Sequence, residues 1–217
     1  RQRQMCIRDS LYPTIDLRAM VRVGSYLEPA DKTGLASITG QVLRTGGTQT
    51  MPGDAIDKEL ETLAATVETG IGQTSGYITV SVLKEDIDKA LNILADILVN
   101  PAFPEPKIDL AKMMQRASIA RRNDNVNQIA FREYRKLIYG QGSPYARQAE
   151  YATIAAITRD DIVNFYKTYF RPNNAIISVV GDFQAKEMIG KIRSTLEKCL
   201  AGKITVPPLP KVEYQYP

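Results

Sequence analysis

Two short runs of alternating polarity, separated by a glycine-containing turn, limit the fold of this chain more than any other feature. Residues 67–71 and 77–83 are strand-like, and Gly72-Gln73-Thr74-Ser75-Gly76 lies between them. Alternation with a period of two predicts half-buried strands, and a short glycine-bounded turn between two such runs predicts a β-hairpin. We therefore expect a sheet that is at least partly antiparallel.

Further apolar patterns place helices and two more strands around this hairpin. Loosely alternating polarity predicts a strand over residues 14–23, and an apolar run predicts another over residues 174–180. Amphipathic periodicity, bounded by glycine, proline or capping residues, predicts helices over residues 31–44, 54–64, 85–99, 105–122, 126–139, 158–169 and 185–200. This order of elements predicts an α+β fold, in which helices pack on a mainly antiparallel sheet.

Several short motifs within these elements are expected to have structural roles. Thr33 and Asp54 are predicted N-caps, and Thr158-Arg159-Asp160-Asp161 has the pattern of a capping box. Gly70-x-Gly72-x-x-x-Gly76 comes near the dinucleotide-binding fingerprint. Its spacing is wrong by one residue, and it lies in a hairpin instead of a strand-to-helix turn, so we interpret it as a turn.

The two ends of the chain differ from the part between them. Residues 1–10 show no hydrophobic period, and no apolar segment of the signal-peptide type follows their charges. We therefore expect a non-native leader there instead of a fold element. The pattern of a folded unit covers residues 11–203. Proline at positions 207, 208 and 210 predicts that residues 204–217 are a linker toward a second unit.

Charge and cysteine content give little support for particular partners. The formal net charge of +4 falls to +2 without residues 1–10, because that segment holds three arginines and one aspartate. A basic stretch from Lys112 to Lys136 has few stacking aromatic residues, so nucleic acid binding is a weak alternative. Cys199 is the only cysteine besides Cys6, which leaves the redox compartment undetermined.

The absence of histidine restricts the chemistry of this chain. With no histidine in its 217 residues, it has no imidazole to bind a metal, to act as a base at neutral pH, or to complete a catalytic triad. The longest apolar runs, such as the one around Ala175-Ile176-Ile177, are too short to span a membrane. Because so many hydrolytic active sites use histidine, its absence excludes most types of hydrolytic active site for these residues.

One ordered series of motifs resembles a known family. Gly24-Ser25-Tyr26-Leu27-Glu28 precedes Gly34-Leu35-Ala36-Ser37-Ile38-Thr39-Gly40-Gln41, and Asn100-Pro101-x-Phe103 and Arg171-Pro172-Asn173-Asn174 follow. The series is similar to the N-terminal unit of the pitrilysin/insulinase zinc peptidases, the inverzincins, over residues 14–200. The resemblance implies the LuxS/metallohydrolase-like fold of a processing-peptidase unit.

The same resemblance implies that the catalytic residues of the family are missing here. Active members carry His-x-x-Glu-His on a helix, whose histidines bind zinc and whose glutamate takes a proton from metal-bound water. The two histidine positions correspond to Ser37 and Gln41, the glutamate position to Gly40, and the third zinc ligand to Ser118. The strand at the active-site edge, which contacts substrate in the family, reads Glu68-Thr69 here.

These substitutions imply a non-catalytic unit without zinc or another cofactor of its own. We expect it to enclose peptide substrate together with a homologous, zinc-bearing subunit or half. A second hypothesis is a purely structural scaffold, as in the core subunits of respiratory complexes. A third and weaker one is a polyanion-binding domain that uses five arginines, namely Arg116, Arg121, Arg122, Arg132 and Arg135.

Overall fold

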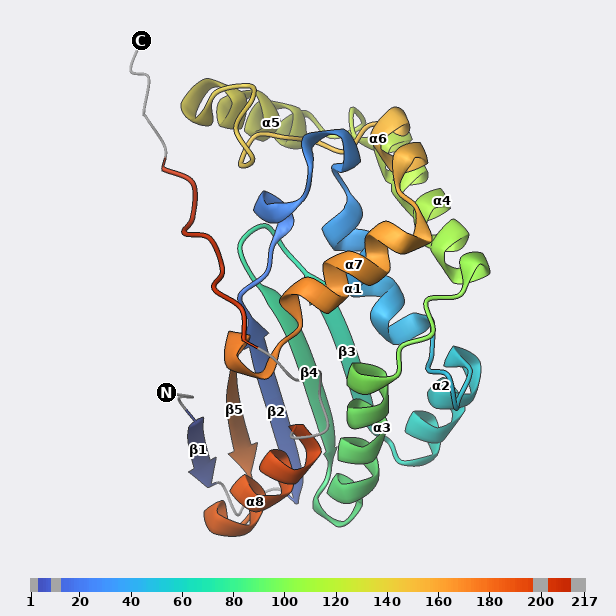
Figure 1. Cartoon of the computed structure of the whole chain (residues 1–217), viewed down its shortest axis with the longest axis vertical. Coiled ribbons are helices and arrows are strands. Elements are labelled where there is room, and N and C mark those ends of the chain that lie inside the picture. The colour runs from blue at the N-terminus through green and yellow to red at the C-terminus, as the bar shows by residue number, and fades with distance from the viewer. Residues whose placement is uncertain (1–3, 9–12, 197–202, 212–217) are drawn as a thin grey trace.

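A five-stranded sheet forms one layer of the protein, as a computed structural model shows (Figure 1). The structure describes residues 4–8, 13–196 and 203–211. The strands lie in the order β1-β5-β2-β4-β3. Their bounds are β1 Gln4–Arg8, β2 Thr14–Val21, β3 Thr66–Ile71, β4 Gly76–Leu83 and β5 Ala175–Gly181.

Four of these strands form an antiparallel sheet around β2. The central strand β2 pairs with β4 on one side and with β5 on the other, both antiparallel. β3 and β4 form the predicted hairpin, in which Gly70 pairs with Tyr77, and the Gly72 amide donates to the Ser75 carbonyl at 2.9 Å in the turn. The prediction of an α+β fold with a mainly antiparallel sheet is therefore confirmed.

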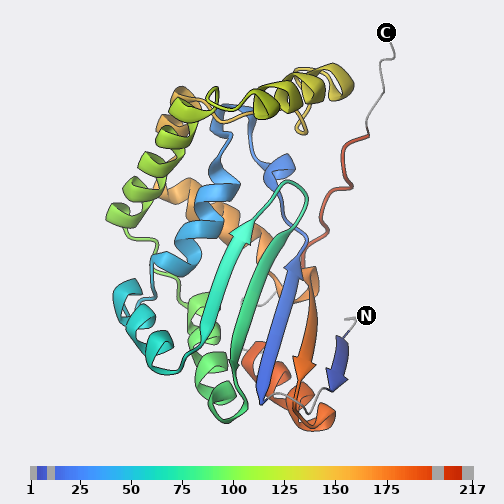
Figure 2. The same cartoon turned by 180° about the vertical axis from the view of Figure 1, so that it is seen from behind.

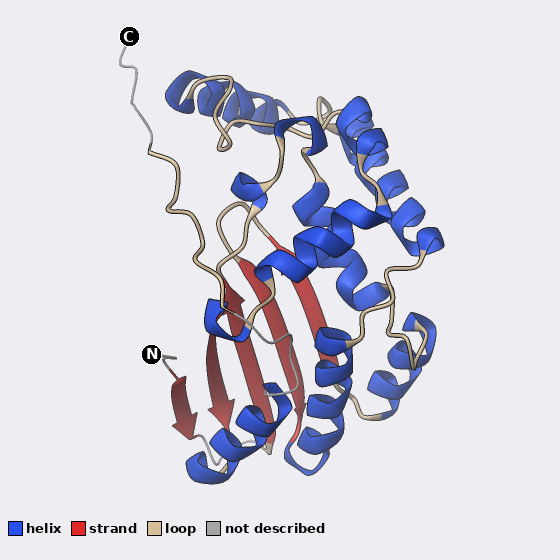
Figure 3. Ribbon diagram, viewed as in Figure 1, coloured by secondary structure: helices blue, strands red, loops and turns tan. Residues whose placement is uncertain are grey.

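Helices cover one face of the sheet, and the other face is bare in the view from behind (Figures 2 and 3). The described residues form eight α-helices: α1 Leu35–Thr45, α2 Gly53–Thr62, α3 Ile87–Val99, α4 Glu105–Arg121, α5 Val126–Tyr139, α6 Tyr151–Ala156, α7 Arg159–Tyr169 and α8 Ala185–Leu196. Helix α6 is not among the predicted helices, because a helix of six residues is too short to show a clear period. None of these helices is long and apolar enough to cross a membrane.

The core lies between the sheet and this helical layer. Along β2, Ile15, Leu17, Ala19 and Val21 are buried, whereas the alternate residues from Asp16 to Met20 are exposed. The buried side chains pack with apolar residues of α1, α3 and α7 into one continuous cluster. The period of two along the strand therefore separates a core face from an open face.

Two predicted helix starts differ from the structure, and one is confirmed. The Thr33 hydroxyl donates to the Ala30 carbonyl, and Gly34, in the left-handed region at φ 110°, is the N-cap of α1. Asp54 lies in the first turn of α2, which Pro52 precedes as N-cap, so its carboxylate acts on the helix dipole and not as a cap. The capping box of Thr158 and Asp161 at the start of α7 is present as predicted.

The backbone of the first ten residues contributes a strand that the sequence analysis did not expect. Residues 4–8 form β1, which pairs in parallel with β5 at the sheet edge. The expectation that residues 1–10 add no fold element is therefore wrong for residues 4–8, because backbone pairing at an edge needs no hydrophobic period. The predicted extension of the last helix to residue 200, with Cys199, lies outside the described residues.

Helix α1 crosses β3 at a very short distance. A Cβ atom on Gly40 would lie 2.5 Å from the amide nitrogen of Ile71 and 2.8 Å from the carbonyl carbon of Gly70. Both of these are backbone atoms, so a side chain at this position could not be accommodated by a rotamer change alone. Glycine at position 40 therefore sets how closely the helix approaches the sheet.

We predict that Gly40→Ala destabilises the protein by about 1–3 kcal/mol, because α1 must move away from β3. Gly190→Ala is the matched control, since Gly190 is an exposed residue of α8 and a Cβ atom there meets nothing within 4 Å. The control should be neutral or stabilising by up to about 1 kcal/mol. Urea unfolding of both variants measures the difference, and equal stabilities would contradict this account of the contact.

Candidate functional site

The positions expected to correspond to zinc ligands lie where α1 runs beside α4. The Ser37 hydroxyl oxygen accepts a hydrogen bond of 2.9 Å from Nε2 of Gln115. Nε2 of Gln41 donates to the sulfur of Met114 at 3.3 Å. Ser118 is exposed and follows Gln115 by one helical turn, about 5 Å along the helix axis. The structure thus brings together the two helices that carry the expected site.

The side chains at this junction do not fit a zinc ion. Ser37, Gln41, Gln115 and Met114 offer hydroxyl, amide and thioether groups, whereas zinc sites in proteins use thiolate, imidazole and carboxylate ligands. Nowhere among the described residues do three cysteine, aspartate or glutamate side chains gather closely enough to hold a metal ion. Hydrogen bonds between these side chains instead join α1 to α4.

Thr69 holds the edge strand β3 against α1. Its side chain is buried, and its hydroxyl donates a hydrogen bond of 2.6 Å to the carbonyl of Gly40. Glu68, the neighbouring residue of the strand, is exposed on the opposite face. Because the Thr69 side chain already binds Gly40, any substrate contact at this residue is left to its backbone. Glu68 keeps its side chain available.

The buried Arg44, which is not among the predicted site residues, binds the backbone of Val67 in the same edge strand, β3. Nε of Arg44 donates to the Val67 carbonyl at 2.7 Å, and Nη2 forms an ion pair with Asp57 of α2 at 2.5 Å. The Arg44 side chain is only 8% exposed. Arginine at the end of an otherwise apolar helix face is the signal that could have identified it, since a buried guanidinium needs partners.

A buried glutamate organises the start of α1. The Glu28 carboxylate accepts hydrogen bonds from the Gly34 amide at 3.1 Å and the Ala36 amide at 2.9 Å. These amides would otherwise lack partners in the first turn of the helix, because Gly34 has no side chain to cap it. Burial raises the pKa of Glu28, although the hydrogen bonds from Ala36 and Gly34 and the charge of Arg147 act to lower it.

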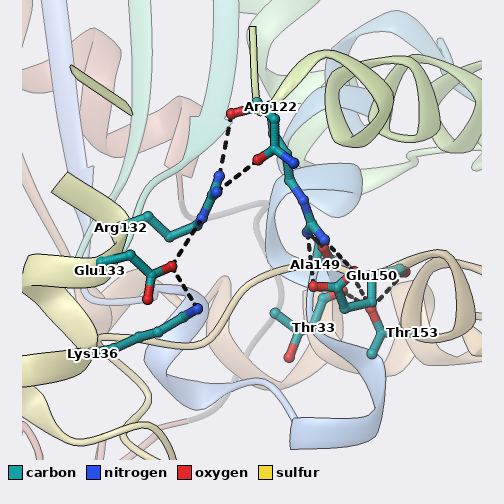
Figure 4. A network of polar contacts seen from close by, with 9 residues as sticks. Thr33, Arg122, Arg132, Glu133, Lys136, Ala149, Glu150 and Thr153 are labelled. Carbon is teal, nitrogen blue, oxygen red and sulfur yellow. Dashed lines mark hydrogen bonds and ion pairs between the residues drawn. The ribbon is translucent and has the colours of Figure 1, made fainter. Parts of the chain in front are cut away.

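A polar network joins the end of α4 to α5 and α6 (Figure 4). Nη1 and Nη2 of Arg122 each contact one carboxylate oxygen of Glu150 at 2.8 Å. Arg132 of α5 donates to the Arg122 carbonyl and to the side chain of Asn123, and Lys136 pairs with Glu133. These residues border a hollow of about 550 Å³. Two of the five arginines considered for polyanion binding are therefore engaged within the protein.

Comparison with protein families gives two matches that together cover most of the chain. Residues 6–149 match the family described as "Insulinase (Peptidase family M16)". Residues 156–217 match the one described as "Peptidase M16 inactive domain". The first match includes both helices of the site, α1 and α4, and the edge strand β3.

Similar proteins include a zinc protease and a subunit of the cytochrome b-c1 complex. An "Uncharacterized zinc protease" of Rickettsia felis is 24% identical over 193 residues, which cover 88% of this chain and 46% of that protein. "Cytochrome b-c1 complex subunit 1, mitochondrial" of Bos taurus is 21% identical over 182 residues, which cover 83% of this chain and 38% of that protein. The chain thus spans less than half the length of these relatives.

A solved structure shows the same fold. The crystal structure of a peptidase M16 inactive domain from Pseudomonas fluorescens superimposes with a TM-score of 0.86 at 23% sequence identity. The match covers 97% of this chain and 50% of the other. The expected fold of a single unit of this kind is therefore confirmed.

We predict that Ser37→His, Gln41→His and Ser118→Glu together create a zinc site, because the two histidines would share one face of α1 and the glutamate would lie on the adjoining helix. Metal analysis after dialysis should find about one zinc per chain. The control replaces Ser118→Glu by Arg116→Glu, which points to a different side of α4. Equal zinc contents in the two triple variants would refute the correspondence of Ser118.

Glu28 predicts a pH dependence of stability. Since its pKa is raised in the folded state, its contribution favours folding most below the ordinary glutamate pKa of about 4.3, and it is lost as the pH rises through the raised value. The difference in unfolding free energy between wild type and Glu28→Gln should therefore decrease as the pH rises above the ordinary glutamate pKa. Exposed Glu68→Gln is the control, and a difference that grows with pH would contradict the assignment.

Proposed function

Because the chain belongs to the insulinase family, M16, of peptidases, we propose that it is a non-catalytic unit that encloses peptide substrate together with a zinc-bearing homologue. In support, the part of the chain that the structure describes has no cluster of three cysteine, aspartate or glutamate side chains that could hold a metal ion, and position 40 carries no carboxylate. The full-length protein then acts in proteolysis as a partner, not as the subunit that cleaves.

The contact at Gly40 carries this proposal. The resemblance assigns the catalytic glutamate of active members to position 40, and here a Cβ atom would lie 2.5 Å from the Ile71 amide nitrogen. A glutamate in this place would require α1 and β3 to separate. The lack of a carboxylate at position 40 therefore follows from the packing of α1 against β3. A single substitution toward the active motif would not restore a general base. The lack of histidine throughout the chain supports the same reading.

A role in binding peptide is supported by the position of β3. This strand is at the edge of the sheet, and edge strands bind extended peptides through main-chain hydrogen bonds. The exposed Glu68 side chain adds a negative charge beside that edge. We propose that Glu68 and the backbone of Thr69 contact the substrate, with basic or polar side chains of the peptide near Glu68.

A structural scaffold is the second candidate. The similarity to subunit 1 of the cytochrome b-c1 complex favours it, because that relative is described as a subunit of a complex and not as a protease. Polyanion binding receives less support, since Arg122 pairs with Glu150 and Arg132 donates to Asn123 and to the Arg122 carbonyl. The first two candidates differ in whether a zinc-bearing homologue gains activity in the presence of this protein.

The test uses the full-length protein and a homologue from the same genome that carries His-x-x-Glu-His. We predict that peptide hydrolysis rises well above that of the homologue alone only when the two are mixed, and that chelation abolishes it, because zinc is bound by the homologue. Metal analysis of the separated proteins should find zinc in the homologue alone.

Two outcomes would count against the proposal. Zinc bound stoichiometrically to the present chain would refute the zinc-free assignment. A mixture that is no more active than the homologue would refute the role in proteolysis and favour the scaffold.

Glu68→Lys, at an exposed position of the edge strand, should alter peptide affinity in the mixture. Exposed Glu59→Lys, on α2, is the control for the change in charge.

A further inference from the structure

The hollow between the end of α4, helix α5 and the loop before α6 has an excess of positive charge. Its volume is about 550 Å³. Two carboxylates, those of Glu133 and Glu150, are among its lining groups. Four cationic side chains also line it, namely Arg122, Arg132, Lys136 and Arg147, so the lining has a formal net charge of +2. A concave surface lined by one sign of charge concentrates ions of the opposite sign.

Two of these cations are held in place by contacts within the protein. Figure 4 shows Arg122 joined to Glu150, and Arg132 joined to the end of α4. Arg132 donates to the Arg122 carbonyl at 3.2 Å and to the Asn123 side chain at 2.7 Å. A long polyanion needs cations on an open surface, whereas a small anion gains from cations that are already fixed, because little side-chain freedom is then lost on binding.

The other two cations keep hydrogen-bond donors for a ligand. Within the described part of the chain, the Arg147 side chain makes one hydrogen bond, from Nη1 to the Glu28 carbonyl at 3.2 Å. The Lys136 ammonium group likewise makes one, to Glu133 at 2.8 Å. A guanidinium group has five N–H donors and an ammonium group has three, so both side chains can bind a further acceptor.

The remaining lining of the hollow is polar and contains no aromatic ring among the described residues. Amide side chains come from Asn123, Gln141 and Gln148, and a hydroxyl comes from Thr33. Amide groups can both donate to and accept from the hydroxyl groups of a ligand. Without an aromatic ring, the base of a nucleotide would have no stacking partner. The lining therefore fits a small polar anion better than a nucleotide or a nucleic acid strand.

We propose that this hollow binds a phosphate group, present as the free ion or carried by a small polar molecule such as a phosphorylated sugar. A phosphate ester carries a charge of about −1.5 to −2 at pH 7, which matches the net charge of the lining, whereas a carboxylate carries a single charge. Arginine and lysine are also the side chains whose donors suit phosphate oxygens. The site is separate from the edge of β3, so it adds a ligand to the proposed function.

The experiment is calorimetric titration of the full-length protein at low ionic strength with inorganic phosphate, glucose 6-phosphate and glucose. We predict saturable binding of the phosphate compounds, at one site per chain, and none of glucose. Lys136→Gln should weaken this binding at least about fivefold, because it removes one charge from the lining. Lys107→Gln is the matched control and should leave the affinity unchanged. The Lys136 and Lys107 side chains are 33% and 32% exposed and each pairs with a carboxylate, but Lys107 does not line the hollow.

A second variant should act in the opposite direction. Glu133→Gln removes a negative charge from the lining, so it should strengthen phosphate binding at least about twofold. Loss of folded protein cannot produce such a gain. Glu61→Gln, at an exposed position of α2, is the control and should have no effect.

The three ligands also distinguish the two sources of the phosphate group. Tighter binding of glucose 6-phosphate than of inorganic phosphate would support a phosphorylated sugar, whose hydroxyl groups then contact the amide side chains. Equal binding of the two would support the free ion. Absence of saturable binding by both phosphate compounds, equally tight binding of glucose, or equal losses in the two lysine variants would overturn the proposal. None of these measurements needs zinc or peptidase activity, so their outcome does not depend on the proposed function.

Discussion

The close crossing of α1 over β3 is the constraint on which the rest of this structure depends. It requires glycine at position 40, because the backbone of Gly70 and Ile71 occupies the space of a side chain. The hydroxyl of Thr69 binds the Gly40 carbonyl at the same point, so the contact is polar as well as steric. A helix held this close to the sheet leaves no space for a side chain at position 40.

The two ends of α1 are fixed by charged groups that are themselves buried. Glu28 accepts from the first amides of the helix, and Arg44 in the last turn binds the Val67 carbonyl of the edge strand. A buried charge is tolerated only with partners: Glu28 has the Gly34 and Ala36 amides, and Arg44 has the Val67 carbonyl and Asp57 of α2. Glu28 and Arg44 therefore act as structural supports of one helix, one at each end.

Function in this molecule is consequently expected at its surfaces. The edge strand β3 presents the exposed Glu68 side chain, and α5 exposes large apolar side chains while Arg132 binds the body. In the proposed function, the edge of β3 is the surface that meets an extended peptide, because edge strands offer main-chain hydrogen bonds.

Local patterns in the sequence were sufficient for the α+β class, the hairpin, seven of the eight helices and the family resemblance, because periodicity and turn residues act over a few positions. They were insufficient for β1, whose strand forms by pairing with residues about 170 positions away. The resemblance predicts that Ser37, Gly40 and Gln41 replace the catalytic residues of active members, whereas only the tertiary structure shows that the backbone of β3 leaves no space for a side chain at position 40. It likewise decided which face of α5 is exposed, since amphipathicity gives two faces to a helix and long-range packing determines which one meets solvent.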